Sequence, residues 1–395
     1  MSRTHEADPE SDRRPAVCIV RHNYYPDTHV RRDAEALVAA GYDVCVVALR
    51  RHGQPSSETM NRVRVYRLPV RHRRGSVLRY AWEYGAFTLL ATVTVAVLHL
   101  RYRFAAVEVD NMPDILILAG LFPKLTGAKL VFYIFDNMPE LLAYLRGWSL
   151  NHPLIRMLSW VERLAASAGD RVIVPHERAR QIVVGRGTSN SRVTVVLNTA
   201  DDRVFRPLAG AAVDDRFTIV SHGAILERYG IQVLIDALPE VIAQVPETEV
   251  HIFGEGEHRT ALEAQARARG VDAFVKFRGF VSLDELLTAI TAARVGYVGM
   301  LNDLTLPNKL MEYVALGIPV VLARWPAFEA YFSEDAVYYF RPGDSVELAR
   351  ALVLIYRDPE GAQQRARRAS RMFREYAWDV QRQKYLGVYE GLLLK

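Results

Sequence analysis

Short apolar runs of four to six residues alternate with helical patterns along almost the whole chain. This alternation is typical of βα units, which build parallel sheets. The expected strands are residues 17–20, 44–49, 63–68, 105–109, 130–134, 171–174 and 193–197, and, in a second series, 217–221, 250–253, 275–277, 295–297, 319–322 and 337–340. The sequence therefore predicts an α/β protein with two Rossmann-like, doubly wound domains facing a cleft, with ligands bound at the carboxyl ends of the strands.

The two series of strands are separated by residues 201–215, a polar stretch that contains Pro and Gly and has no periodicity. Such a composition is typical of a linker. We expect an N-terminal domain over residues 15–205 and a C-terminal domain over residues 206–375. The polar residues 1–14 are expected to form a disordered tail, and they do not resemble a signal peptide.

Cysteine and histidine usage excludes several classes of protein. The two cysteines, Cys18 and Cys45, lie in apolar runs, which excludes a disulfide scaffold and suits a reducing cytosol. The eleven histidines show no metal-ligand spacing, so no metal site is predicted. The first strand runs into RHNYYPD rather than a glycine-rich turn, which argues against a nicotinamide dinucleotide site.

The segment 301–321 contains the first candidate for a chemical role. Pro307 and Asn308 precede a helix expected from about Lys309, and Gly317 ends it. Unpaired N–H groups at a helix N-terminus bind phosphate, and Lys309 adds a full charge. Glu312, one turn later, could reach a ribose hydroxyl. An Asn N-cap, a snorkelling Lys and a solvated Glu explain the same residues equally well.

A second candidate is the segment 219–238, where a strand is followed by Gly223 and by Arg228 just before Gly230. A glycine at the end of a strand allows a ligand to approach the backbone closely. Arg228 could then bind a diphosphate through two parallel hydrogen bonds. Taken alone, an ordinary βα loop with a surface arginine is the simpler interpretation.

Together these segments resemble glycosyltransferase family 4, retaining enzymes of the two-Rossmann GT-B fold that use nucleotide-diphosphate sugars. The resemblance runs through residues 24–49, 195–207, 222–230, 251–290, 306–321 and 376–393. It implies that residues 376–395 pack back onto the first domain. It also implies a donor site without a metal or other cofactor in the C-terminal domain.

The resemblance also assigns individual donor-site residues. Glu312 matches the second glutamate of the family's paired-glutamate motif, which holds the donor ribose. Gly279, Phe280 and Val281 match the loop against which the nucleobase lies. Gly223 matches the glycine whose loop faces the donor phosphates.

At three positions the chain departs from the family pattern. Ala224 stands where many members have Arg, and Arg228-Tyr229-Gly230 stands where they have Glu-Lys-Gly, so that Arg228 is the natural substitute for the cation. Leu304 replaces the first glutamate of the pair, and Asp303 or Thr305 could contact the sugar hydroxyls in its place. The resemblance thus implies that Arg228, Lys309 and Glu312 are catalytic, with Asn308 at the phosphate-binding helix end.

Two similar turns, DNMPD (110–114) and DNMPE (136–140), each follow an expected strand. Asp or Asn before Pro is a good helix start, so a structural role explains both turns equally well. In the functional interpretation, Asp110, Asn111, Asp136 and Glu140 bind the hydroxyls of an acceptor. Histidine, which related proteins often carry at the positions of Asp110 and Phe135, is missing.

The segment 62–103 combines positive charge with an apolar run. Residues 50–103 hold eleven Arg and only two acids, Glu58 and Glu83, whereas residues 84–100 have no formal charge. That run is short for a membrane span, so we expect one buried helix. The basic flank favours an anionic lipid surface. Nucleic acid is not expected as a partner, because no aromatic stacking platform or groove-reading helix is evident.

The sequence therefore predicts a metal-independent, retaining glycosyltransferase with a donor of the UDP or GDP type. Its acceptor is expected to be a lipid-linked glycan or a cell-surface polysaccharide precursor, and its location the cytoplasm or the inner face of the membrane. Glycosylation of a small natural product, a non-catalytic GT-B partner protein and a nucleotide-sugar epimerase are the alternatives.

Overall fold

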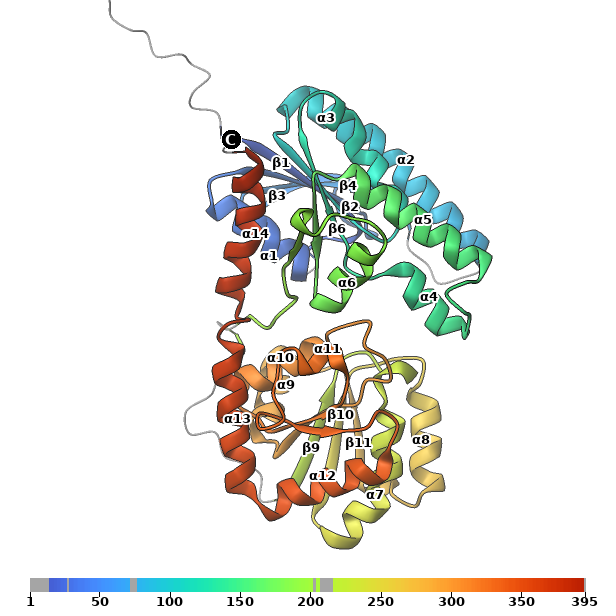
Figure 1. Ribbon diagram of the computed structural model, residues 1–395, viewed down its shortest axis with the longest axis vertical. Helices are drawn as coiled ribbons and strands as arrows, with labels where there is room; N and C mark the ends of the chain where they lie inside the picture. The colour runs from blue at the N-terminus through green and yellow to red at the C-terminus, as the bar shows by residue number, and fades with distance from the viewer. Residues whose placement is uncertain (1–13, 27, 72–76, 202–203, 207–215, 394–395) are drawn as a thin grey trace, which may run out of the picture. The chain divides into compact units, whose positions relative to one another are not determined.

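The computed structural model describes residues 14–26, 28–71, 77–201, 204–206 and 216–393, which form two compact units (Figure 1). Unit 1 comprises Met1–Leu197 and Arg382–Lys395, and unit 2 comprises Asn198–Gln381. The first boundary thus falls at 197 instead of the expected 205, because Val196 and Leu197 are buried whereas the Asn198 side chain bonds to Asn308 of unit 2. Most of the expected tail and linker (1–13, 202–203 and 207–215) lies outside the described residues.

The sheet of unit 1 has eight strands in the order β3-β4-β2-β1-β5-β6-β7-β8. All neighbours are parallel except β3, which pairs antiparallel with β4. The strands are β1 (Ala16–Tyr24), β2 (Asp43–Leu49), β3 (Ser57–Met60), β4 (Val63–Leu68), β5 (Ala106–Asp110), β6 (Lys129–Tyr133), β7 (Arg171–Val174) and β8 (Val193–Val195). Only β3 was not expected, because it is a short, mostly polar edge strand without an apolar run.

Helices cover both faces of this sheet (Figure 1). One face packs against α2 (Val77–Tyr102), the 3-10 helix η1 (Asp114–Gly120), α5 (Pro153–Ala168) and α6 (Glu177–Gly185). The other face packs against α1 (Thr28–Ala39) and α14 (Trp378–Leu393). The short helices α3 (Leu121–Leu125), α4 (Met138–Arg146) and η2 (Asn190–Arg192) complete the unit. Burial on both faces explains why the strands are nearly continuous apolar runs.

The last helix, α14, is attached to unit 1 by a buried polar cluster. The Tyr385 hydroxyl donates to Oε1 of Glu108 at 3.2 Å, and the Tyr389 hydroxyl donates to Oε2 at 2.5 Å. Glu108 lies on β5, and burial raises the pKa of its carboxyl group well above the ordinary value. The two tyrosines therefore satisfy a carboxyl group that has no access to water.

The sheet of unit 2 has six parallel strands in the order β11-β10-β9-β12-β13-β14. They are β9 (Phe217–His222), β10 (Thr248–Phe253), β11 (Val275–Gly279), β12 (Val295–Val298), β13 (Val320–Ala323) and β14 (Tyr338–Phe340). The helices are η3 (Glu227–Tyr229), α7 (Ile231–Gln244), α8 (Arg259–Ala268), η4 (Asp272–Phe274), α9 (Leu283–Ala292), α10 (Asn308–Leu316), α11 (Pro326–Glu329), α12 (Ser345–Arg357) and α13 (Pro359–Phe373).

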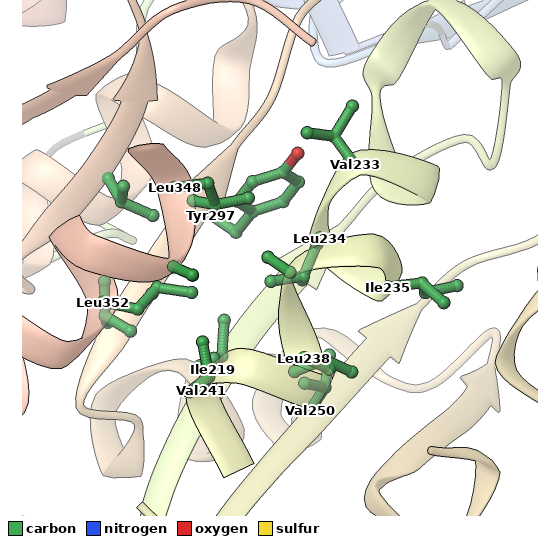
Figure 2. Packing of buried hydrophobic residues seen from close by; sticks show 14 of the residues in the cluster. Ile219, Val233, Leu234, Ile235, Leu238, Val241, Val250, Tyr297, Leu348 and Leu352 are labelled. Atoms are coloured by element: carbon green, nitrogen blue, oxygen red, sulfur yellow. The ribbon is translucent and has the colours of Figure 1, made fainter. Parts of the chain in front are cut away.

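The core of unit 2 lies between the sheet and helices α7 and α12. Leu234, Leu238 and Val241 of α7 pack toward the strand residues Ile219 and Val250 (Figure 2). Leu348 and Leu352 of α12 close the same cluster. This apolar layer fixes the position of β9, and therefore of the loop that follows it.

Each sheet has one point at which the order of its strands reverses. It lies between β1 and β5 in unit 1 and between β9 and β12 in unit 2. In doubly wound folds, ligands bind beyond the carboxyl ends of the strands at this point. The loops after β1, β5, β9 and β12 are therefore the candidate ligand sites of the two units.

Candidate functional site

In unit 2, the loop after β9 passes very close to the loop after β10. Gly223 has a φ of +106°, and a Cβ atom at Gly254 would lie 2.0 Å from the Gly223 carbonyl oxygen. A Cβ atom at Gly256 would lie 2.1 Å from the carbonyl oxygen of Ile225. The two glycines of the FGEGEH segment therefore allow this close backbone contact. Gly223 itself is exposed at the end of the strand.

Helix α10 begins at Asn308, and Pro307 occupies the N-cap position without a side-chain cap. This corrects the expectation that the helix starts at about Lys309 after an Asn cap. The extended backbone of Pro307 (φ −73°, ψ 130°) places Asn308 already inside the helix, and its Oδ1 accepts from Nδ2 of Asn198 at 2.8 Å. Within the described part of the chain, no N-cap side chain bonds to the first turn of α10, so its N–H groups keep their partial positive charge.

Lys309, in the first turn of α10, is buried, with 7% of its surface exposed. Its Nζ donates to Oγ of Ser221, the buried serine near the end of β9, at 3.3 Å. Burial lowers the pKa of Lys309 to about 8, although the nearby Glu312 carboxylate acts in the opposite direction. A buried ammonium group next to a single hydroxyl is a strong attraction for an anion.

Arg228 lies half-buried in η3, close to Lys309. Its guanidinium carbon is 5.2 Å from the centre of the Tyr229 ring, and Nζ of Lys309 is 5.3 Å from the same centre. The structure thus brings the two predicted cations to one aromatic ring, where cation–π contacts hold them. Tyr229 itself was not predicted to be a site residue.

His222, the last residue of β9, lies against the side chain of Glu312. Nε2 of His222 and Oε2 of Glu312 are 3.0 Å apart, but their alignment does not satisfy hydrogen-bond geometry. Neither atom has a hydrogen-bond partner among the described residues. Both atoms are buried, so the contact leaves hydrogen-bonding capacity unused inside the unit. Sequence reasoning missed His222, although a polar residue at a strand end just before Gly223 was a usable signal.

The loop between β12 and α10 carries the residues expected at the sugar. Asp303, Leu304 and Thr305 are half-buried there. Buried Asn302 accepts from the Leu304 N–H at 3.1 Å, and its Nδ2 atom has no partner in the described part of the chain. Asn302 is thus a second polar group that sequence reasoning missed.

The segment Gly279–Val281 lies at the end of β11, two strands from β9. Gly279 has a φ of +68°, and its carbonyl oxygen accepts from the Gly254 N–H at 2.7 Å. Phe280 is 85% exposed, and Val281 is partly exposed. The three residues therefore belong to the same sheet edge as Gly223, with an aromatic side chain open to solvent.

In unit 1, Asp110 is the last residue of β5 and therefore lies at the strand-order reversal. Its Oδ2 is 3.5 Å from Nη1 of Arg21 at the end of β1, and Arg21 lies over the Phe135 ring at 3.9 Å. Asn111 joins the two similar turns, because its Nδ2 donates to the Asp136 carbonyl oxygen at 2.7 Å. The structure therefore brings Asp110, Asn111 and Asp136 together.

The side chain of Glu140 has other partners than these three residues. Its Oε1 is 2.5 Å from Nη2 of Arg186, which also pairs with the buried Glu162. Asn137 donates to the second oxygen of Glu162 at 3.2 Å. Glu140 is thus part of an ion-pair network between α4, α5 and the end of α6, and its Oε1 atom is engaged there rather than with Asp110 or Asp136.

A doubly wound unit with a buried lysine, a second cation and an uncapped helix N-terminus at its strand-order reversal has the features of a nucleotide-phosphate site. Two family models match the chain: "Glycosyl transferase 4-like domain" over residues 26–199 and "Glycosyl transferases group 1" over residues 216–358. The chain belongs to the GT-B glycosyltransferases of the group 4 type. The family and the fold expected from the sequence are confirmed.

Curated relatives are similar over part of their length. Phosphatidyl-myo-inositol mannosyltransferase of Mycobacterium leprae is 29% identical over 164 residues, which is 41% of this chain and 43% of the relative. Chitobiosyldiphosphodolichol beta-mannosyltransferase of Debaryomyces hansenii is 21% identical over 250 residues, which is 56% of this chain and 53% of the relative. The matched segments thus span about half of these relatives.

Solved structures share the whole fold. Sucrose-phosphate synthase from Thermosynechococcus elongatus superposes with a TM-score of 0.79 at 17% identity, covering 96% of this chain and all of that one (100%). Anabaena HepE in complex with UDP gives a TM-score of 0.72 at 15% identity, with 95% and 100% covered. At such identities the likeness concerns the fold alone.

Proposed function

We propose that the protein transfers a sugar, with retention of configuration, from a nucleotide-diphosphate sugar to a hydroxyl acceptor. The observation that carries the proposal is the buried Lys309 beside Ser221, at the uncapped start of α10. A positive charge held out of water at this point of a doubly wound sheet fits a diphosphate. The family to which the chain belongs supports the same reaction class.

The chemical difficulty in such a transfer is the departure of the nucleoside diphosphate. The bond between the anomeric carbon and the phosphate oxygen breaks, and negative charge develops on the diphosphate. Lys309, Arg228 and the first N–H groups of α10 would stabilise that charge, which is electrostatic catalysis. Because its pKa is about 8, Lys309 is largely protonated at neutral pH.

Further donor contacts are assigned by position. His222 and Glu312 offer adjacent polar atoms for the ribose hydroxyls, and Phe280 offers a ring to the base. Asp303 or Thr305 would contact the sugar. A donor of the UDP or GDP type is proposed, and the complex of the similarly folded HepE with UDP supports the former.

For the acceptor we propose a lipid-linked glycan or a polysaccharide precursor, bound near Asp110 and Asp136 of unit 1. The buried Asn111 amide holds the two turns together, because it is bonded to Asp114 and to the backbone of the second turn. The names of the two curated relatives support this choice, since one is a mannosyltransferase of phosphatidyl-myo-inositol and the other a mannosyltransferase of chitobiosyldiphosphodolichol. With such an acceptor, we propose that the protein is peripheral to the cytoplasmic face of a membrane, and we propose no nucleic-acid partner. A small natural-product acceptor is the alternative.

Two alternative functions can be distinguished from the proposed sugar transfer by experiment. The fold is also similar to a putative UDP-N-acetylglucosamine 2-epimerase from Listeria monocytogenes, at a TM-score of 0.63 and 13% identity. An epimerase would convert its nucleotide sugar without any acceptor. A non-catalytic partner protein would bind the nucleotide sugar without releasing nucleotide.

The test is thermal-shift screening with UDP, GDP, ADP and dTDP, followed by nucleotide release from the corresponding donor. A specific nucleotide raises Tm by mass action. Lys309→Ala should abolish the shift, whereas Lys276→Ala, whose Nζ bonds to a backbone carbonyl near the start of β11, should keep it. No shift with any nucleotide, or an equal shift in Lys309→Ala, would contradict the proposed donor site.

A further inference from the structure

Exposed apolar side chains are concentrated on one part of unit 1. Of the 23 large hydrophobic residues that are exposed in the described chain, 17 lie between Trp82 and Leu164. They belong to α2, η1, α3, α4, α5 and the connection between α4 and α5. Because η1 packs against both α2 and α5, and α3 against α2, these elements form one continuous layer (Figure 1). Monomeric soluble proteins rarely expose so many apolar groups together.

The centre of this surface is the outer side of α2. We call it the apolar face and define it by Trp82, Leu89, Val93, Val97 and Leu100 of α2. Their exposed fractions lie between 56% and 68%. No charged residue occurs between positions 84 and 100, although a helix at a solvated surface normally turns a polar side to water.

Helix α2 is nevertheless part of the folded unit. The segment Arg79–Tyr102 is long and apolar enough to cross a membrane, with a third (33%) of its most apolar window buried. Its inner side packs on the sheet through Phe87, Ala91 and Val95, and the buried Glu83 carboxyl group lies 3.1 Å from Nε2 of His22. These contacts correct the expectation of a fully buried helix: one side is in the core and the other is open.

The charges around the apolar face have one sign. Between Arg79 and Ala168, no Asp or Glu of the described chain is exposed, and Glu83, Asp114 and Glu162 are almost completely buried. Exposed arginines lie at the end of α2 (Arg101, Arg103) and on α5 (Arg156, Arg163). The partner must therefore present an apolar interior together with negative charge. An anionic bilayer has both properties, and tryptophan side chains favour its interface.

We propose that the apolar face inserts into the interface of an anionic membrane, with α2 lying in the membrane plane and the arginines on the lipid head groups. The proposed surface differs from the basic stretch 62–103 that the sequence predicted to attract lipid, because some arginines of that stretch are paired within the fold. Arg64 is within 3.7 Å of Asp43, and the buried Arg67 is paired with Glu58. Residues 72–76 lie outside the described chain. Insertion is independent of donor binding, so either proposal can fail alone.

The experiment measures sedimentation of the full chain with vesicles. The double variant Leu89→Asn/Val93→Asn is compared with the wild type and with Leu283→Asn/Leu354→Asn, which changes two equally apolar, exposed residues of unit 2 (50% and 51% exposed). Vesicles of phosphatidylcholine alone, or mixed with phosphatidylglycerol, are used at low and high salt. We expect the Leu89/Val93 variant to lose about tenfold or more in partitioning to mixed vesicles, and the control variant to lose none.

Salt separates insertion from charge attraction alone. High salt should reduce binding of the wild type by screening the arginines, but a fraction that depends on Leu89 and Val93 should remain. Complete loss of wild-type binding at high salt would contradict insertion. The thermal shift with nucleotide, measured in parallel, should be the same in all three proteins.

A second measurement keeps the proposal testable if the double variant fails to fold. Both native cysteines, Cys18 and Cys45, are buried, so a thiol dye sensitive to polarity can be placed at Leu89→Cys and, as the control, at Leu354→Cys. Mixed vesicles should shift the emission of the dye at position 89 to the blue and leave the control unchanged. Equal behaviour of the two, or a wild-type dimer in light scattering that Leu89→Asn/Val93→Asn dissociates, would overturn the membrane assignment.

Discussion

The Nζ atom of Lys309 lies 3.3 Å from the Oγ atom of Ser221, which joins the first turn of α10 to the end of β9. Both residues are almost fully buried. A charge in such a place lowers the stability of the ligand-free protein, because desolvation is only partly offset by one hydroxyl and by Glu312. The contact therefore marks a position at which stability and ligand binding are opposed.

Lys309→Met should separate these two effects. The folded-state pKa of Lys309 is lowered from 10.5 to about 8, so the unfolded chain binds more protons between these values and wild-type stability rises with pH through that window. At pH 7 the variant should be more stable by about 1 to 3 kcal/mol in denaturant unfolding, and its extra stability should shrink above pH 8. Nucleotide binding should be lost. Lower stability at pH 7 would contradict a buried, weakly compensated charge.

Arg228→Ala and Lys309→Ala should each remove about 2–4 kcal/mol of transition-state stabilisation, mainly in kcat. The reason is that both cations lie against Tyr229, at the proposed phosphate site. Turnover is measured by nucleotide release, with Lys276→Ala as the matched charge removal outside the site. If both single variants turned over like the wild type, the site assignment would be wrong.

Turnover should be unchanged by EDTA. Lys309, Arg228 and the α10 N-terminus are proposed to replace a divalent ion at the diphosphate, and within the described ranges no group of three metal-ligating side chains occurs. The measurement is nucleotide release before and after chelation and after adding Mn²⁺ or Mg²⁺. Loss of turnover with EDTA and recovery with metal would refute metal independence.

Asp114→Asn should change the pH dependence of stability in unit 1. Burial, and then the Glu162 charge, raise the pKa of Asp114 from 3.8 to about 7, although a hydrogen bond from Asn111 opposes the shift. Between pH 3.8 and about 7 the folded state keeps a proton on Asp114 that the unfolded chain loses. The stability that this proton contributes is therefore fully present below pH 3.8 and is lost as the pH rises to about 7. An uncharged amide should therefore stabilise the protein by about 1–3 kcal/mol above pH 7 and have little effect at low pH. A uniform change at every pH would show that the charge is not responsible.

The strands could be predicted because burial on both faces leaves a continuous apolar run, and this signal is local. Strand β3 could not, since an edge strand needs little apolar surface. Lys309 and Arg228 were found from local motifs, but the Lys309–Ser221 contact joins residues 88 apart in sequence, and the pairing of Glu140 with Arg186 joins residues 46 apart. Such partners leave no local pattern. The outer side of α2 was misread because composition gives the apolarity of a helix but not how much of it is covered.

The chain passes between its two units at Leu197 and again at Gln381, within α14. A shortened protein that ends at Leu197 would remove Tyr385 and Tyr389 and leave the Glu108 carboxyl group buried without its two donors. Recombination between relatives, in the laboratory or in evolution, therefore has to exchange unit 2 as an internal segment, with one crossover after Leu197 and a second after Gln381. A chimera with a single crossover near Leu197 would place a foreign α14 against β5, and it should fold only if that helix brings its own pair of tyrosines.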